Sequence, residues 1–314
     1  MFFEYCAGEI LGAAFPCGLT HCALRNIMLR SYTELRFRAS CTVAGADFYS
    51  LIEGGEYMLA LITGASGGIG MELARLFAAD GHDLLLVARR QERLDSLKTE
   101  LEAAHGVAVT ALAVDLAETG AAQAVFSFAR ERSLRVDALV NNAGFGDWGF
   151  FAESDLSKQR RMIELNVTAL TELSRLFLPE MIERGSGRVL NVASVASFVP
   201  GAKMSVYYAT KAFVRSFSEA LSVELKKSET GVTVTALCPG PVRTDFWETA
   251  EAGKSRLLKH FLFTDAKSVA RYGYNAMKKG RAVALPGFLV RAGVALVKIL
   301  PGAWVRNAIY SIQK

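Results

Sequence analysis

Short apolar runs alternate with helix-like segments from Met58 to Leu285, and this alternation permits few folds. The runs cover residues 58–63, 84–88, 109–114, 138–141, 188–193, 232–237 and 281–285. Segments rich in Ala, Leu, Glu, Lys and Arg lie between them, at residues 69–79, 92–104, 121–131, 156–183, 203–227 and 266–279. Strands that alternate with helices pair in parallel, and right-handed crossovers put helices on both faces of the sheet. The sequence therefore predicts an α/β fold, a doubly wound parallel sheet of about seven strands.

Composition narrows the class of protein. The 314 residues are 51% apolar and 21% charged, which allows a large buried core, and the net charge of +5 is spread without a basic run. We therefore expect no nucleic-acid partner. No apolar stretch is long enough to span a bilayer, since the nearest, residues 288–300, contains Arg291 and Lys298.

The cysteines indicate a reducing, cytoplasmic setting. Cys6, Cys17, Cys22 and Cys41 lie near the start and Cys238 lies alone, so no disulfide framework emerges. Cys17 and Cys22 flank His21 but form no paired Cys-x-x-Cys motif, and we predict no metal site.

Three parts are expected along the chain. Residues 1–57 contain no lysine and no sustained period, and we interpret them as a poorly ordered extension or as upstream sequence read from a start assigned too early. Glu53-Gly54-Gly55-Glu56 is what a purine-rich ribosome-binding site would encode before Met58, although a real extension could contain the same loop. Residues 58–285 would form the catalytic domain, and residues 286–314 an apolar tail.

A glycine-rich turn follows the first expected strand and opens the first helix. It reads Thr63-Gly64-Ala65-Ser66-Gly67-Gly68-Ile69-Gly70. Glycines allow the backbone to approach a pyrophosphate closely, and a helix N-terminus offers free N–H groups and a positive dipole end. We therefore predict a dinucleotide site here.

The end of the second strand bears on cofactor choice. Arg89 and Arg90 stand where an acidic residue would hold the ribose hydroxyls of NAD, and arginine suits a 2′-phosphate. They favour NADPH over NADH, unless they only begin a solvated helix. Asp115, followed by Leu116, ends the third strand and is placed either to meet the adenine edge or to cap a helix.

Ser194, Tyr207 and Lys211 form the candidate catalytic group. Tyr207 and Lys211 are four residues apart and share a helix face. An ammonium beside a phenol favours the phenolate and should lower the tyrosine pKa, which makes Tyr207 a candidate acid/base.

The motifs together closely resemble the short-chain dehydrogenase/reductase family. They are the glycine turn, Asn141-Asn142-Ala143-Gly144, Asn166, Ser194, Tyr207-x-x-x-Lys211 and Pro239-Gly240, and they cover about residues 58–244. The spacing is similar to that of the single-domain branch of about 250 residues, and to ketoacyl and steroid-type carbonyl reductases within it. The resemblance implies a Rossmann fold, and its spacing selects Tyr207 over Tyr208.

The resemblance also implies residue roles. Tyr207 would exchange the proton, Lys211 would support it and bind the nicotinamide ribose, Ser194 would hold the substrate oxygen, and Asn166 would hold a water. The full set expected to bind the cofactor is Thr63, Gly64, Ser66, Gly67, Gly68, Ile69, Gly70, Arg89, Arg90, Asp115, Leu116, Asn142, Ala143, Gly144, Tyr207, Lys211, Pro239, Gly240, Val242 and Thr244.

The expected activity is NADP(H)-dependent reduction of a hydrophobic ketone, aldehyde or 3-oxoacyl group. Apolar and aromatic residues in 145–151, 197–205 and after Thr244, with Phe246, Trp247, Phe261, Leu262 and Phe263, would contact the substrate. A cofactor-binding sensor or scaffold without turnover, and an epimerase or dehydratase, are the alternatives.

A homodimer or homotetramer is expected by family resemblance. The tail would cover the pocket, join subunits or lie on a membrane surface.

Overall fold

The computed structural model describes residues 58–250 and 263–313. Residues 1–57, Phe261 and Leu262, on which some of the expectations above rest, lie outside the described residues.

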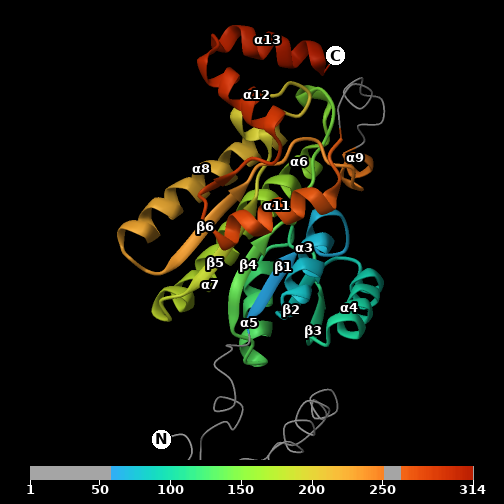
Figure 1. Ribbon diagram of the computed structural model, residues 1–314. Helices are drawn as coiled ribbons and strands as arrows, with labels where there is room; N and C mark the ends of the chain where they lie inside the picture. The colour runs from blue at the N-terminus through green and yellow to red at the C-terminus, as the bar shows by residue number, and fades with distance from the viewer. Residues whose placement is uncertain (1–57, 251–262, 314) are drawn as a thin grey trace, which may run out of the picture. The chain divides into compact units, whose positions relative to one another are not determined.

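The strands form a parallel sheet in the order β3-β2-β1-β4-β5-β6-β7 (Figure 1). Their bounds are β1 Leu59–Thr63, β2 Asp83–Ala88, β3 Val109–Ala113, β4 Val136–Asn141, β5 Gly187–Val192, β6 Val232–Leu237 and β7 Val283–Ala284. The chain builds outward from β1 to β3 and then returns to add β4 on the other side of β1. This reversal leaves a crevice at the carboxyl ends of β1 and β4, where such sheets bind ligands. The predicted doubly wound sheet is confirmed.

Helices cover both faces of the sheet. The α-helices of the described residues are α3 Gly68–Ala79, α4 Gln91–His105, α5 Ala121–Glu131, α6 Leu156–Ile163, α7 Leu170–Glu183, α8 Ser205–Lys227, α9 Phe246–Thr249, α11 Ala266–Lys278, α12 Phe288–Ile299 and α13 Gly302–Ile312. Ala60 and Ile62 pack with α3, α4 and α11, whereas Leu59 and Leu61 pack with α5, α7 and α8. Successive side chains of a strand point to opposite faces, so an apolar run such as β1 supplies both cores.

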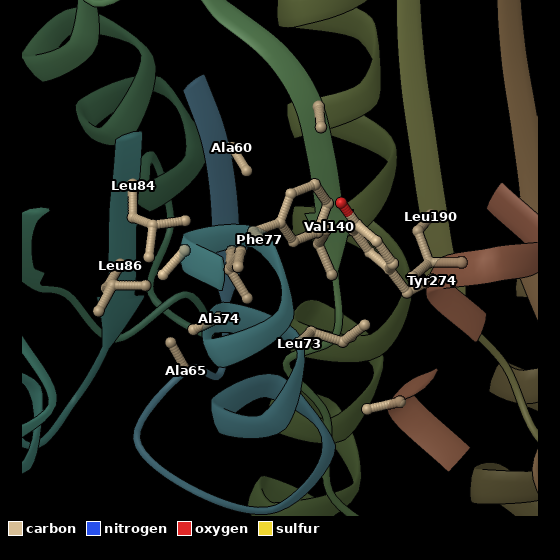
Figure 2. Close-up of a cluster of buried hydrophobic side chains, with 14 of the residues drawn as sticks. Ala60, Ala65, Leu73, Ala74, Phe77, Leu84, Leu86, Val140, Leu190 and Tyr274 are labelled. Atoms are coloured by element: carbon tan, nitrogen blue, oxygen red, sulfur yellow. The ribbon is translucent and has the colours of Figure 1, made fainter. Parts of the chain in front are cut away.

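Figure 2 shows the core between the sheet and helices α3 and α11. Phe77 of α3 and Tyr274 of α11 meet edge to face, with ring centroids 4.8 Å apart. The Tyr274 hydroxyl donates to Asp80 over 2.7 Å, so the ring is buried while its polar end is satisfied. This contact fixes α11 against the C-terminal end of α3.

The long helix expected at residues 156–183 is interrupted. Helix α6 ends at Ile163, a π-helical stretch, η3, covers Glu164–Ala169, and α7 continues from Leu170. A π-helical turn inserts an extra residue and shifts the side chains that follow it, often beside a functional site. Asn166 lies within this turn.

Helices α12 and α13 pack beyond the carboxyl ends of the strands (Figure 1). Helix α12 contacts the short 3₁₀ helix η4, Val195–Phe198, which follows β5. Within residues 58–250 and 263–313, no helix is long and apolar enough to cross a membrane.

Candidate functional site

A cavity of about 330 Å³ opens at the carboxyl ends of the strands, and most of the residues selected from the sequence line it. The predicted residues on its wall are Gly64, Ser66, Gly67, Gly68, Ile69, Arg89, Arg90, Asp115, Leu116, Asn142, Ala143, Gly144, Ser194, Tyr207, Lys211, Pro239, Gly240, Val242 and Thr244. Thr63, Gly70 and Asn166 are not on the wall and act from behind it.

The glycine turn is held to the end of β4 by polar side chains. Thr63 Oγ1 accepts from the backbone N–H groups of Asn142 and Ala143, each over 3.0 Å. Asn142 Nδ2 donates to the Thr63 and Gly64 carbonyls over 2.9 and 3.2 Å. A side chain at Gly70 would collide with Asn142 and with the Gly64 carbonyl, so this glycine permits close packing. These bonds give the turn its shape.

The N-terminus of α3 presents free donors to the cavity. Its first residues, Gly68 and Ile69, line the wall, and no side chain among the described residues caps this helix. Gly64 and Gly68 have φ of +65° and +55°, which is the left-handed region that glycine adopts without strain. Uncapped N–H groups at a helix start fit a phosphate group. The site therefore has the shape and donors that a dinucleotide pyrophosphate requires.

Arginines border the side of the cavity near β2. Arg90 lies 3.4 Å from Ser66 Oγ, and Arg89 lies 3.8 Å from the Asp115 carboxylate. Asp115 also accepts from Arg161 over 2.7 Å and from the Ala117 N–H over 3.0 Å. Asp115 therefore closes a local turn and pairs with arginines, instead of capping α5, which begins at Ala121.

Arg93 and Asp245 were missed by sequence reasoning. Arg93 follows Arg90 on α4 and donates to Asp245 over 2.9 Å, while Arg90 lies 3.6 Å from the same carboxylate. This partnership holds the Asp245 pKa below its usual range, chiefly through the Arg93 hydrogen bond. The three-residue spacing from Arg90 could have identified Arg93. Asp245 carries no comparable sequence pattern, because it approaches Arg93 only through tertiary folding.

Tyr207 and Lys211 project from α8 and meet Ser194 at the end of β5. Lys211 is buried, and its Nζ donates to the Val192 carbonyl over 2.8 Å. The same Nζ lies 5.9 Å from the centre of the Tyr207 ring. Ser194 caps the N-terminus of η4, and its Oγ accepts from the Ala196 N–H over 3.1 Å. The group expected from the sequence is thus assembled in one place.

Burial controls the proton affinities of these groups. It raises the pKa of Tyr207, and the hydrogen bond with Ser194 opposes that rise. This is the reverse of the lowering expected from Lys211, because desolvation of the phenolate outweighs its neighbours. The same burial lowers the pKa of Lys211 to about 8. Tyr207 is therefore protonated at neutral pH and suited to donate a proton.

Asn166 organises the wall from behind. Its Oδ1 accepts from the Phe145 N–H over 3.1 Å, and its Nδ2 donates to the Phe145 carbonyl over 3.0 Å. Nδ2 also lies 3.1 Å from Thr210 Oγ1 on α8. The π-helical turn thus ties the loop after β4 to the helix that carries Tyr207.

Aromatic side chains enclose the other end of the cavity. Phe145, Met204, Phe246 and Trp247 line it, together with Tyr208, whose pKa burial raises to about 12. The Phe246 ring centre lies 5.3 Å from that of Tyr207, and Trp247 Nε1 donates to the Val242 carbonyl over 2.9 Å. Phe263 contacts Trp247 edge to face at 5.9 Å. This end of the site is suited to an apolar group.

The chain is similar to known proteins. A family model described as short chain dehydrogenase matches residues 58–255. Ketoacyl reductase HetN from Nostoc sp. is 38% identical to this chain over 182 residues. The match covers 58% of this chain and 62% of the length of HetN.

Two solved structures are similar over most of their length. A short-chain dehydrogenase from Sphingobium yanoikuyae in complex with NADPH is 36% identical, with a TM-score of 0.70 and coverage of 81% of this chain and 95% of that one. A short chain dehydrogenase/reductase from Burkholderia phymatum in complex with NAD is 28% identical, with a TM-score of 0.70. The match covers 76% of this chain and 92% of that one.

Proposed function

This chain belongs to the short-chain dehydrogenase/reductase family, and we propose that it transfers hydride between NADPH and the carbonyl carbon of a hydrophobic substrate. The observation that carries the proposal is that the uncapped helix N-terminus and Ser194, Tyr207 and Lys211 line the same cavity. The cofactor would supply the hydride. The chain's own residues would bind, orient and provide the proton.

The preference for NADPH rests on charge. Arg89 and Arg90 line the cavity near the end of β2, and a guanidinium pairs well with a phosphate. The end of β2 supplies no carboxylate that would hold ribose hydroxyls, since Ala88 is followed directly by Arg89. The NADPH complex of the Sphingobium relative supports this preference, whereas the NAD complex of the Burkholderia relative makes the cofactor test necessary.

The proton would come from Tyr207. Burial keeps its hydroxyl protonated at neutral pH, and Ser194 next to it would hold the substrate oxygen as negative charge develops there. Lys211, with its pKa lowered to about 8, can return a proton near neutral pH. Asn166 would act as a positioning residue through Phe145 and Thr210.

The substrate class follows from the aromatic end of the cavity. Phe145, Phe246 and Trp247 offer apolar surface beside Tyr207, so a ketone, an aldehyde or a 3-oxoacyl group with an apolar substituent would fit.

The proposed assembly is a homodimer or homotetramer. It is supported by exposed apolar side chains on the two long helices, Ile182 on α7 with Phe213 and Val223 on α8. Sedimentation of the purified chain measures the assembly directly.

Replacing the two adjacent tyrosines tests the chemistry. Tyr207→Phe should bind NADPH as the wild type does, measured by fluorescence titration, while turnover falls by at least about a thousandfold. Tyr208→Phe removes the neighbouring hydroxyl from the same wall and should retain turnover. Oxidation of NADPH and NADH is followed across ketones, aldehydes and acyl thioesters. Activity retained in Tyr207→Phe would refute the assignment, and NADPH binding without turnover of any carbonyl would favour a sensor, epimerase or dehydratase.

A further inference from the structure

The outer face of α12 is apolar. Val290, Val294 and Val297 recur at helical spacing and face the body of the protein, with Val294 buried. These inward positions account for the packing of the helix. On the outward side, Phe288, Leu289 and Ile299 are 75%, 73% and 79% exposed. A helix that meets water on one side is normally polar there, so this face is suited to a different surrounding.

Helix α13 repeats the pattern. Val305 on its inward side and Gln313, which caps its C-terminus, are buried, and Gln313 Nε2 donates to the Tyr208 hydroxyl over 3.0 Å. Trp304 on the outward side is 68% exposed, and Tyr310 is exposed as well. Both helices are therefore attached to the body by one side and present the other side outward.

The charged side chains of residues 286–314 are all positive. Residues 286–314 contain Arg291, Lys298, Arg306 and Lys314 and no aspartate or glutamate. Arg291 and Arg306 are exposed beside the apolar side chains, and the Lys298 ammonium lies 5.8 Å from the centre of the Phe198 ring. An apolar helical face bordered only by cations complements a surface that is anionic at its boundary and apolar beneath.

We propose that α12 and α13 bind the surface of an anionic phospholipid membrane. The exposed side chains of Phe288, Leu289, Ile299 and Trp304 would enter the boundary between headgroups and acyl chains, with Arg291 and Arg306 at the phosphates. The two helices, of 12 and 11 residues, are each too short to span a bilayer. They would therefore lie along its surface.

A second copy of this chain fits the face less well. Two tails in contact would bring their cations together without an acidic residue in 286–314 to pair with them. Like charges that meet in an interface oppose association, whereas anionic headgroups attract the same residues.

The position of the tail has a consequence for the substrate, which rests on the proposed function. Tyr208, which receives the Gln313 hydrogen bond, and Gly240, which Val290 approaches, both line the cavity. A membrane held by this tail would lie next to the cavity wall. An apolar carbonyl compound dissolved in lipid would then be held close to the site.

Flotation of the full chain with vesicles tests the membrane contact independently of turnover. Binding is compared for phosphatidylcholine vesicles and for vesicles that also contain phosphatidylglycerol. We expect the wild type to float with the mixed vesicles, and added salt to weaken this binding. Arg291→Gln with Arg306→Gln should weaken binding to the mixed vesicles by about fivefold for each charge removed.

A second variant tests the apolar contribution, and a third serves as the control. Phe288→Ser, Leu289→Ser and Trp304→Ser combined should reduce binding at least about a hundredfold. These side chains are exposed, so circular dichroism should show an unchanged fold. Leu156→Ser removes an apolar side chain that is 60% exposed on α6 and should bind as the wild type does. A wild-type chain that stays unbound on mixed vesicles would overturn the proposal, as would a triple variant that binds equally well or that only loses a dimer seen by light scattering.

Discussion

The Asp245 carboxylate lies 2.9 Å from Arg93 Nη1. This hydrogen bond joins the segment after β6 to helix α4 across the glycine turn. Arg90, from the end of the β2 segment, lies 3.6 Å from the same carboxylate. A carboxylate that occupies these arginines competes with any phosphate that approaches them. Asp245 is therefore placed to weaken the binding of a 2′-phosphate.

Asp245→Asn should lower the KM for NADPH by about two- to fivefold, the range expected for an exposed ion pair. The KM for NADH should change less, because NADH lacks the 2′-phosphate. Initial rates with each cofactor measure both values. Asp155→Asn removes the same charge from an exposed helix cap outside the cavity wall and serves as the control. A higher KM for NADPH in Asp245→Asn would show that the carboxylate helps to hold the cofactor.

Lys211 should cost the protein stability at neutral pH. Its pKa is lowered from 10.5 to about 8 by burial, so the unfolded chain holds this proton more tightly than the folded chain does. Its contribution to stability is therefore highest above pH 10.5, falls as the pH drops toward 8, and is constant below that. The difference corresponds to about 3 kcal/mol at pH 7.

Lys211→Met should thus have a Tm at pH 7 that is no lower than that of the wild type, although its turnover is lost. The advantage of the variant should shrink as the pH rises from 8 to 10.5. Thermal unfolding of both proteins at each pH, compared pairwise, cancels the titration of the other groups. A variant that is less stable at pH 7 and shows no pH trend would mean that the bond to the Val192 carbonyl dominates.

Gly144 should tolerate no side chain without loss of activity. A Cβ there would lie 2.9 Å from Asn166 Oδ1 and 3.3 Å from Lys211 Nζ, so Gly144→Ala must displace one of them. A displacement of about 1 Å in such a group costs on the order of a hundredfold in kcat/KM. Gly149→Ala, in the same loop but with open space around its Cβ, should retain activity. Equal activity of the two variants would contradict the packing described here.

Much of the architecture could be predicted because each strand and helix is encoded locally. The seven predicted strands lie within a few residues of β1 to β7, since their apolar runs are bounded by turns and helices. The interruption at Glu164–Ala169 could not be predicted, because its residues are compatible with an ordinary helix. Within it, the Asn166 amide bonds to Phe145 and Thr210, which are distant in sequence.

The pKa of Tyr207 is a second property that the sequence did not predict. Spacing placed Lys211 beside it, and the proximity is confirmed at 5.9 Å from ring centre to Nζ. The direction of the pKa shift depends on burial, which is a property of the packed site, and burial raises it. A pattern of residue types identifies the group but not its surroundings.

The sequence by itself determined the alternating strands and helices, the glycine turn and the spacing of Ser194, Tyr207 and Lys211, because these depend on residues close together in the chain. The tertiary structure alone decided that Arg93 meets Asp245, that Asn166 supports the loop after β4, and that α12 and α13 adjoin the cavity with their apolar sides outward. Contacts between distant segments arise only when the sheet brings its loops to one edge, and no local pattern records which side chains meet there.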